Sequence, residues 1–261
     1  MTQFSLRQQA FLEKEMRQKQ FVFFSRIFLF IFLLSLWEIA GRQKWIDVFF
    51  FSSPSRILYA LLDMVKNKSL FLHVGLTMGE TLLSFSIVTI LTLFVALLLW
   101  SNRALAQILE PYLILCNSLP KSALAPLFIV WFGHNVKTIL IAGISVAIFG
   151  SILTLYTQFK EMNDEKSKLI YTLGGNQFHV LSKVILPASV PMIFSTMKVN
   201  IGLCLVGVII GEFLVAKAGL GYLIMYGSQV FKLDWVMLSI FLLCGIALIL
   251  YKILAIAEKK L

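Results

Sequence analysis

Charged side chains interrupt apolar runs at Glu80, Glu110, Lys121, Lys198 and Glu212. A charged group inside a membrane span is costly, so it marks either a functional site or an internal pair. Glu80 and Glu110 lie close to the ends of their runs and can alternatively be read as interfacial residues. Lys198 and Glu212 are close to four helical turns apart, so they share a helix face but cannot touch along it, and each needs another partner or water. The candidate functional residues inside the predicted spans are Lys121, Trp131, Lys198 and Glu212, with internal pairing as the alternative.

No set of side chains predicts an enzyme. The sequence contains no nucleophile elbow, no zinc-binding HExxH and no phosphate-binding glycine loop. The cysteines and histidines lie far apart in the sequence, at Cys116, Cys204, Cys244, His73, His134 and His179. We therefore expect no catalytic residue, no metal site and no cofactor. If the protein uses energy from ATP, another chain must supply it.

A polar insertion at residues 158–187 has the pattern of a helix, a turn and a second helix. The first helix is predicted to end at Gly174 and Gly175, because a double glycine readily forms a helix-ending turn. Asn176 can begin the second helix, and Pro187 is tolerated in the first turn of the span that follows. Such a motif, protruding from a membrane, would present apolar side chains to a docking partner.

These candidate residues must be positioned by membrane-spanning helices. Of the 261 residues, 59% are apolar and only 14% are charged, which excludes a disordered chain and is unlike an ordinary soluble domain. About 20 mostly apolar residues cross a bilayer as a helix. We therefore predict an all-α integral membrane protein with about six spans, near residues 21–40, 76–100, 104–132, 138–156, 188–214 and 235–257. The third span must be kinked or split by its three prolines, Pro111, Pro120 and Pro126.

Basic residues suggest the orientation of these spans. The net charge is +10, and Lys and Arg are more frequent on the side that carries both termini, so we expect the termini in the cytoplasm. Because the basic residues lie mainly beside apolar runs, the positive charge does not indicate a nucleic-acid partner. Residues 1–20 are predicted to be a cytoplasmic amphipathic segment on the membrane surface, or alternatively a solvated basic tail. Residues 21–261 form the predicted transmembrane domain, with a loop at 215–234.

Four collinear motifs resemble the permease subunits of ATP-binding-cassette importers, in the nitrate, sulfonate and taurine branch. The family signature places a Gly, nine residues, Ile, one residue and Leu-Pro in order, and this spacing is matched by Gly174 and Leu186-Pro187. Its Glu-Ala-Ala positions fall on Lys168-Leu169-Ile170, so the name-giving acid is absent here. Further similar segments are 119–133, 208–224 and the pair Trp37-Glu38 with Ser53-Pro54-Ser55.

The resemblance implies a type I importer core with a cytoplasmic coupling helix in a bacterial-type inner membrane. It also implies two cytoplasmic ATP-binding subunits, an extracytoplasmic solute-binding protein, a second copy of the chain and surrounding lipid. The implied cargo is a small polar, often anionic solute such as a sulfonate, taurine or nitrate, or a thiamine precursor. The implied coupling residues are Lys168, Tyr171, Leu173, Gly174, Gly175, Phe178 and Pro187. In such a permease, we expect the translocation path to pass near the four intramembrane candidates, Lys121, Trp131, Lys198 and Glu212. The rival interpretations are an autonomous secondary transporter, an intramembrane enzyme and a structural membrane subunit.

Overall fold

The computed structural model describes residues 6–162 and 164–259, and within these ranges the regular elements are all helical. Five helices are long and apolar enough to cross a membrane. They are α1 (Leu6–Arg42), α4 (Ser69–Ser101), α7 (Val136–Glu161), α10 (Leu186–Val215) and α12 (Leu233–Lys259). At a rise of about 1.5 Å per residue, each exceeds the thickness of the hydrocarbon core.

A broken pair of helices is long and apolar enough, taken together, to count as a sixth span. Helix α5 (Arg103–Ser118) and helix α6 (Lys121–Phe132) meet at an angle of 95°, with Leu119 and Pro120 between them. Proline cannot donate a backbone hydrogen bond and clashes with the preceding turn, so the chain bends where the sequence predicts it. The prediction of about six spans, with a split third span, is confirmed.

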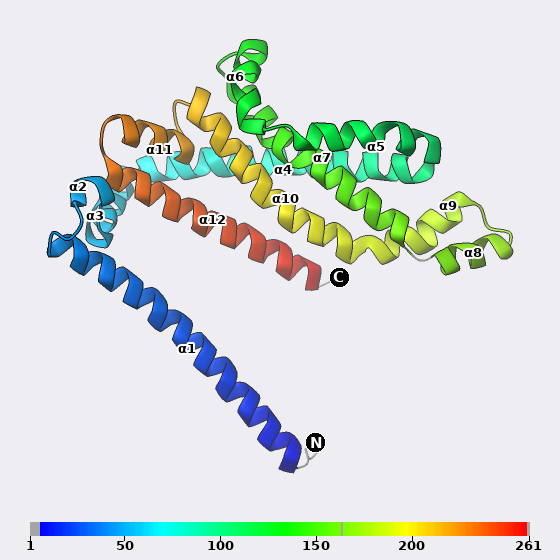
Figure 1. Ribbon diagram of the computed structural model, residues 1–261, viewed down its shortest axis with the longest axis horizontal. Coiled ribbons are helices and arrows are strands. Elements are labelled where there is room, and N and C mark those ends of the chain that lie inside the picture. The colour runs from blue at the N-terminus through cyan, green and yellow to red at the C-terminus, as the bar shows by residue number, and fades with distance from the viewer. Residues whose placement is uncertain (1–5, 163, 260–261) are drawn as a thin grey trace.

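The centre of the protein is formed by α4, α7 and α10, and α12 lies against α10 (Figure 1). Glycines permit a very close approach between α7 and α10. A Cβ atom on Gly207 would lie 2.7 Å from the carbonyl oxygen of Ala142, and one on Gly211 would lie 2.8 Å from the Cα of Ile139. Small residues stabilise helix pairs in membranes in this way, because the backbones gain dispersion contacts.

Short helices gather at the two ends of this bundle. At one end lie α2 (Val48–Phe51), α3 (Pro54–Lys66) and α11 (Leu220–Gln229), and at the other lie α8 (Asp164–Thr172) and α9 (Gln177–Val180) (Figure 1). Helix α11 corrects the prediction of a loop at 215–234. The glycine-rich sequence is needed to turn the chain before the helix, but it does not prevent ten residues from packing as a helix behind it.

The ends of two spans also differ from the prediction. Helix α4 begins at Ser69 rather than near Leu76, because Asn67 accepts hydrogen bonds from the Ser69 backbone N–H at 3.0 Å and from its hydroxyl at 2.7 Å. Helix α1 runs without a break from Leu6, so much of the predicted amphipathic segment is continuous with the first span. Figure 1 shows α1 standing away from the other spans, joined to them at its C-terminal end.

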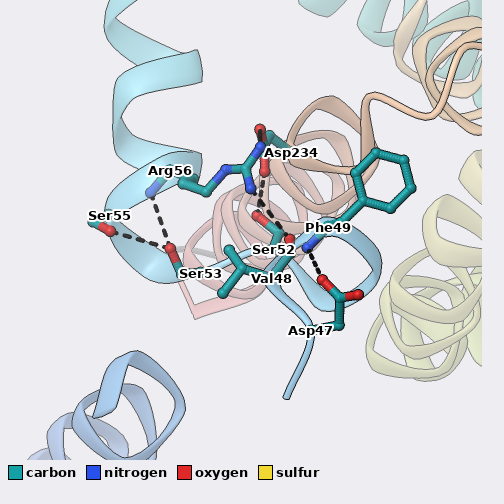
Figure 2. A network of polar contacts seen from close by, with 8 residues as sticks. All are labelled: Asp47, Val48, Phe49, Ser52, Ser53, Ser55, Arg56 and Asp234. Atoms are coloured by element: carbon teal, nitrogen blue, oxygen red, sulfur yellow. Dashed lines mark hydrogen bonds and ion pairs between the residues drawn. The ribbon is translucent and has the colours of Figure 1, made fainter. Parts of the chain in front are cut away.

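A polar network lies among the short helices that follow α1 (Figure 2). The hydroxyl of Ser52 donates to Asp234 at 2.7 Å, and the guanidinium of Arg56 pairs with the same carboxylate at 3.1 Å. Asp47 and Ser53 accept hydrogen bonds from the backbone N–H groups of Phe49 and Arg56, in the first turns of α2 and α3. The short helices α2 and α3 are therefore tied to the start of α12.

Candidate functional site

The segment between α7 and α10 forms the helix-turn-helix that the sequence predicts. Helix α8 ends where Gly174 adopts a positive φ of 81°, and the N–H of Gly175 donates to the Ile170 carbonyl at 2.9 Å. Both glycines are needed for different reasons. Gly174 has open space around it but a left-handed backbone, whereas a Cβ on Gly175 would lie 2.5 Å from Cγ2 of Ile170.

The second half of this motif begins with a capping box. The side chain of Asn176 accepts from the His179 N–H at 3.1 Å, while His179 Nδ1 accepts from the Asn176 N–H at 3.2 Å. A π-helical turn (Leu181–Ile185) follows and leads directly into α10, with Pro187 in the first turn. The chain therefore passes from the motif into a span without an intervening loop.

Buried anchors hold the motif on the bundle while its tip remains in solvent. Val180 and Ile185 are each 1% exposed and belong to a core cluster with Leu99 and Phe159. The amide of Gln177 also donates to the Ser101 carbonyl at 2.8 Å, which links α9 to the end of α4. In contrast, the large apolar side chains of the tip are exposed: Leu169, Tyr171, Leu173 and Phe178. Lys168 is exposed beside them.

The four intramembrane candidates have separate surroundings. The Lys121 ammonium donates to the Cys116 carbonyl and lies 5.0 Å from the centre of the Phe149 ring. Trp131 is exposed on α6. Lys198 pairs with Glu258 of α12 at 2.8 Å, which supplies the partner that the sequence alone could not identify. The role of these residues in a translocation path stays a prediction.

Glu212 is buried at the N-terminus of α11. Its carboxylate accepts from the Gly221 N–H at 2.6 Å and from the Thr77 hydroxyl at 2.6 Å. The side chain is 1% exposed, and three backbone N–H groups at the start of α11 donate to side chains. The other two acceptors are His73 Nδ1, which bonds the Gly219 N–H at 3.0 Å, and Thr77 Oγ1, which bonds the Leu220 N–H at 2.8 Å.

Glu80 lies one helical turn from Thr77 and beside Glu212, and it is 9% exposed. Glu80 is therefore packed inside the bundle, and its interpretation as an interfacial residue stays a prediction. Helix α4 begins seven residues earlier than predicted, which places Glu80 further from the helix end. The roles of His73 and Thr77 were missed, although their spacing of four residues places both on one face of α4.

A second polar feature is a groove of about 370 Å³ lined by α5, α7 and α10. It begins beside Asn117, in the last turn of α5 before the break, and continues along α7 past Ser151 to Gln158. Helix α10 contributes Thr196 and Asn200. Among the described residues, no cluster of three or more His, Cys, Asp and Glu side chains could hold a metal ion.

Comparison with known proteins places this architecture. Residues 88–257 match the family model described as "Binding-protein-dependent transport system inner membrane component". The chain is 26% identical over 194 residues to a formylaminopyrimidine transport permease protein of Halalkalibacterium halodurans, covering 74% of this chain and 76% of that protein. It is 23% identical to the taurine transport system permease protein of Escherichia coli, covering 88% and 85% of the two chains.

A third relative is a putative aliphatic sulfonates transport permease protein of Bacillus subtilis, which is 22% identical and covers 96% of this chain and 91% of its own. Among solved structures, the inward-facing MetNI methionine ABC transporter aligns with a TM-score of 0.65, 16% identity, 73% of this chain and 95% of that chain. An amino acid ABC transporter aligns with a TM-score of 0.62, 18% identity, 77% of this chain and 98% of that chain. At these identities the two structures show a shared fold.

Proposed function

This chain belongs to the family of binding-protein-dependent transport system inner membrane components, and we propose that two copies of it form the path of an importer driven by separate ATP-hydrolysing subunits. The resemblance predicted from Gly174 and Leu186-Pro187 is thereby confirmed at the level of the family, and the chain is a permease subunit of an ABC importer. The ATPase subunits, the pairing of two copies and the solute-binding protein belong to the proposal.

The exposed tip of the α8–α9 motif is the observation that supports this proposal most directly. Leu173 and Phe178 are 75% and 70% exposed, although the residues just behind them are almost fully buried. Large apolar side chains gathered on a protrusion are typical of an interaction site, because their burial against a partner is favourable. We propose that Tyr171, Leu173 and Phe178 dock into the ATPase, with Gly174, Gly175 and Pro187 shaping the motif and Lys168 at its rim.

The orientation that this docking requires places both chain termini in the cytoplasm. The α8–α9 motif, the turn between α4 and α5 and the C-terminal end of α12 lie toward the same end of the bundle (Figure 1). The excess of Lys and Arg on this side supports a cytoplasmic position. The opposite end, with α2, α3 and α11, would face the solute-binding protein.

The proposed cargo is a small polar solute of the kinds that the names of the relatives indicate. These names include taurine, aliphatic sulfonates and formylaminopyrimidine. The proposed path includes the broken α5–α6 crossing, because interrupted helices in membranes are tolerated where they line a cavity or are covered by protein. Lys121, Trp131, Lys198 and Glu212 remain proposed path residues.

Purification of the tagged chain from its native membrane in mild detergent tests the proposal. We expect a protein with a phosphate-binding glycine loop to co-purify and to hydrolyse ATP, and we expect the chain stripped of that protein to hydrolyse none. The partner is identified by mass spectrometry, and the number of permease copies by the mass of the complex. Robust ATP hydrolysis by the chain alone, or the absence of such a partner, would contradict the proposed function.

A further inference from the structure

The groove between α5, α7 and α10 is polar but carries no charge. Its lining side chains are mainly hydroxyls and carboxamides, with a few aliphatic residues and no Lys, Arg, His, Asp or Glu. The most deeply placed are Ser151, Thr196 and Asn200, which are 3%, 6% and 2% exposed. This composition is unusual for the membrane-spanning part of a chain, where polar groups that faced lipid would lose hydrogen bonds to water.

Two polar atoms of this groove are buried without a hydrogen-bond partner among the described residues. They are the hydroxyl oxygen of Thr196 and the side-chain carbonyl oxygen of Gln158. Asn200 instead accepts a hydrogen bond from Ser151, so part of the groove is already fixed by internal contacts. Buried polar groups are normally bonded, so these two covered oxygens of lining residues would gain a partner if a hydrogen-bonding solute entered the groove and reached them.

Two lysines that lie near groove residues in the sequence, Lys121 and Lys198, do not line the groove. Lys198 pairs with Glu258 of α12. Lys121 lies only four residues from Asn117, but its ammonium turns to the Cys116 carbonyl and the Phe149 ring. It lines a separate pocket whose wall is almost entirely apolar. On the groove side, Gly150 allows α5 to come close, since a Cβ there would be 3.0 Å from the Asn117 carboxamide oxygen. Asn117 thus faces the groove where Lys121 does not.

We infer that this groove is the cargo-contact surface of the path and that it selects a neutral, hydrogen-bonding solute of the aminopyrimidine kind over an alkyl sulfonate, an inference that rests on the proposed function. Carboxamides and hydroxyls both donate and accept, so they complement the paired donors and acceptors of a neutral heterocycle. A sulfonate keeps its charge and needs a cation or a dense array of N–H donors to replace its hydration. The groove supplies no cationic side chain for that purpose.

The first test measures which solutes the groove admits. Thr154 lines the groove and is itself exposed, so Thr154→Cys is made in a chain whose native cysteines Cys116, Cys204 and Cys244 are replaced. The complete importer is treated, in membranes open on both sides, with hydroxyethyl or sulfonatoethyl methanethiosulfonate, which are similar in size but neutral and anionic. The rate at which each reagent modifies the introduced cysteine is divided by the rate at which the same reagent reacts with free cysteine. Lys66→Cys on α3 provides an exposed control position.

We expect the neutral reagent to be favoured at Thr154→Cys by at least about tenfold, because an uncompensated charge is penalised away from bulk water. At Lys66→Cys no such preference for the neutral reagent is expected. An equal or faster normalised reaction of the anionic reagent would overturn the inference, and so would a lack of reaction with either reagent, since a path must admit solutes.

The second test asks whether the unpaired hydroxyl of Thr196 is a ligand. Cytosine, as a neutral aminopyrimidine, should slow labelling at Thr154→Cys, and ethanesulfonate should not. Adding Thr196→Val should remove this protection, while Thr92→Val should keep it, because Thr92 is an equally buried, unpartnered hydroxyl on α4 outside the groove. Protection by ethanesulfonate, protection that survives Thr196→Val, or no protection at all would overturn the inference. Co-purification of the ATPase is measured on the same variants. If no ATPase co-purifies, the proposed function has failed, whereas an ATPase-bound importer without the expected selectivity contradicts only the inference about the groove.

Discussion

The hydroxyl of Thr77 on α4 donates a hydrogen bond of 2.6 Å to the carboxylate of Glu212 on α10, across 135 positions of the chain. The same hydroxyl oxygen accepts from the Leu220 N–H at 2.8 Å, and the second carboxylate oxygen of Glu212 accepts from Gly221. Three helices, α4, α10 and α11, therefore meet at two side chains. We interpret this contact as the element that holds α11 against the spans.

Replacement of Glu212 should destabilise the protein without preventing its insertion. Glu212→Leu leaves the Gly221 N–H and the Thr77 hydroxyl without their acceptor, at a cost of about 1–3 kcal/mol for each buried group. Glu212→Gln keeps one carbonyl oxygen and should lose less. The measurement is the thermal denaturation temperature of the purified importer in detergent. Equal denaturation temperatures for Glu212→Leu and the wild type would refute this structural role.

A methyl group at Gly219 should disturb the same contact from the other side. Gly219 has φ of 126°, and a Cβ there would lie 2.5 Å from the carboxylate carbon of Glu212. A strained backbone of this kind costs about 1–3 kcal/mol in a residue other than glycine, before the clash is counted. Gly219→Ala should thus lower the denaturation temperature by several degrees at least, roughly as expected for this cost.

Gly202 provides the matched control for this substitution. It lies within α10, and a Cβ there would meet nothing within 4 Å. Because alanine favours helix more than glycine does, Gly202→Ala should leave the denaturation temperature unchanged or raise it slightly. If Gly202→Ala and Gly219→Ala have the same effect, the contact between Gly219 and Glu212 is not the cause.

The pair formed by Lys198 and Glu258 joins α10 to the C-terminal end of α12. Their charged atoms are 2.8 Å apart and both side chains are partly buried. We expect Lys198→Glu to lower the yield of assembled importer, because two carboxylates then face each other. The exchanged pair, Lys198→Glu with Glu258→Lys, should recover more than half of that loss. Size-exclusion chromatography of the complex measures the yield, and failure of the exchange to rescue it would argue against direct pairing.

The proposed orientation predicts opposite labelling of two exposed lysine positions at opposite ends of the bundle. In a chain without its native cysteines, Lys66→Cys on α3 should react with a membrane-impermeant maleimide added to intact cells. Lys166→Cys on α8 should react only after the cells are opened. Labelling of Lys166→Cys in intact cells would reverse the topology and remove the proposed ATPase docking site from the cytoplasm.

The extent to which the sequence predicted this fold depends on how local each signal is. Apolar runs and Pro120 predicted the spans and the split crossing, because hydrophobic length and a missing backbone donor act within a few residues. Gly174 and Asn176 predicted the turn and the following helix for the same reason. Helix α11 could not be found in this way, since two of the first N–H groups at its N-terminal turn bond to His73 and Thr77, which lie 146 and 143 positions away in the chain.

The same limit applies to the candidate path. Lys198 and Glu212 were identifiable as costly intramembrane charges, but their partners Glu258 and Thr77 depend on how helices pack. The polar groove was missed because its members are Ser, Thr, Asn and Gln residues spread over three helices, each unremarkable in its own apolar run. A useful signal would have been the recurrence of small polar residues on one face of 151–158 and 195–200.

The coupling role of the α8–α9 tip gives the last prediction. Leu173 is 75% exposed, so Leu173→Asp should leave folding and insertion intact while it removes an apolar anchor from the proposed interface. Loss of such an anchor typically costs about 2 kcal/mol or more, which corresponds to roughly thirtyfold weaker binding of the ATPase. Leu173→Met retains the apolar contact and should bind normally.

Gly174→Val tests the geometry of the same tip independently of its chemistry. Valine is strained at a φ of 81°, so Leu173 and Phe178 should be displaced from each other even though both side chains remain. We expect Gly174→Val to weaken ATPase binding as Leu173→Asp does, and to reduce cargo uptake in cells in proportion. Gly245→Ala on α12, where a Cβ would meet nothing within 4 Å, is the control. Full ATPase recovery and wild-type uptake in both Leu173→Asp and Gly174→Val would show that motion of the ATPase reaches the spans through some other contact, because neither the anchor nor its placement would then matter.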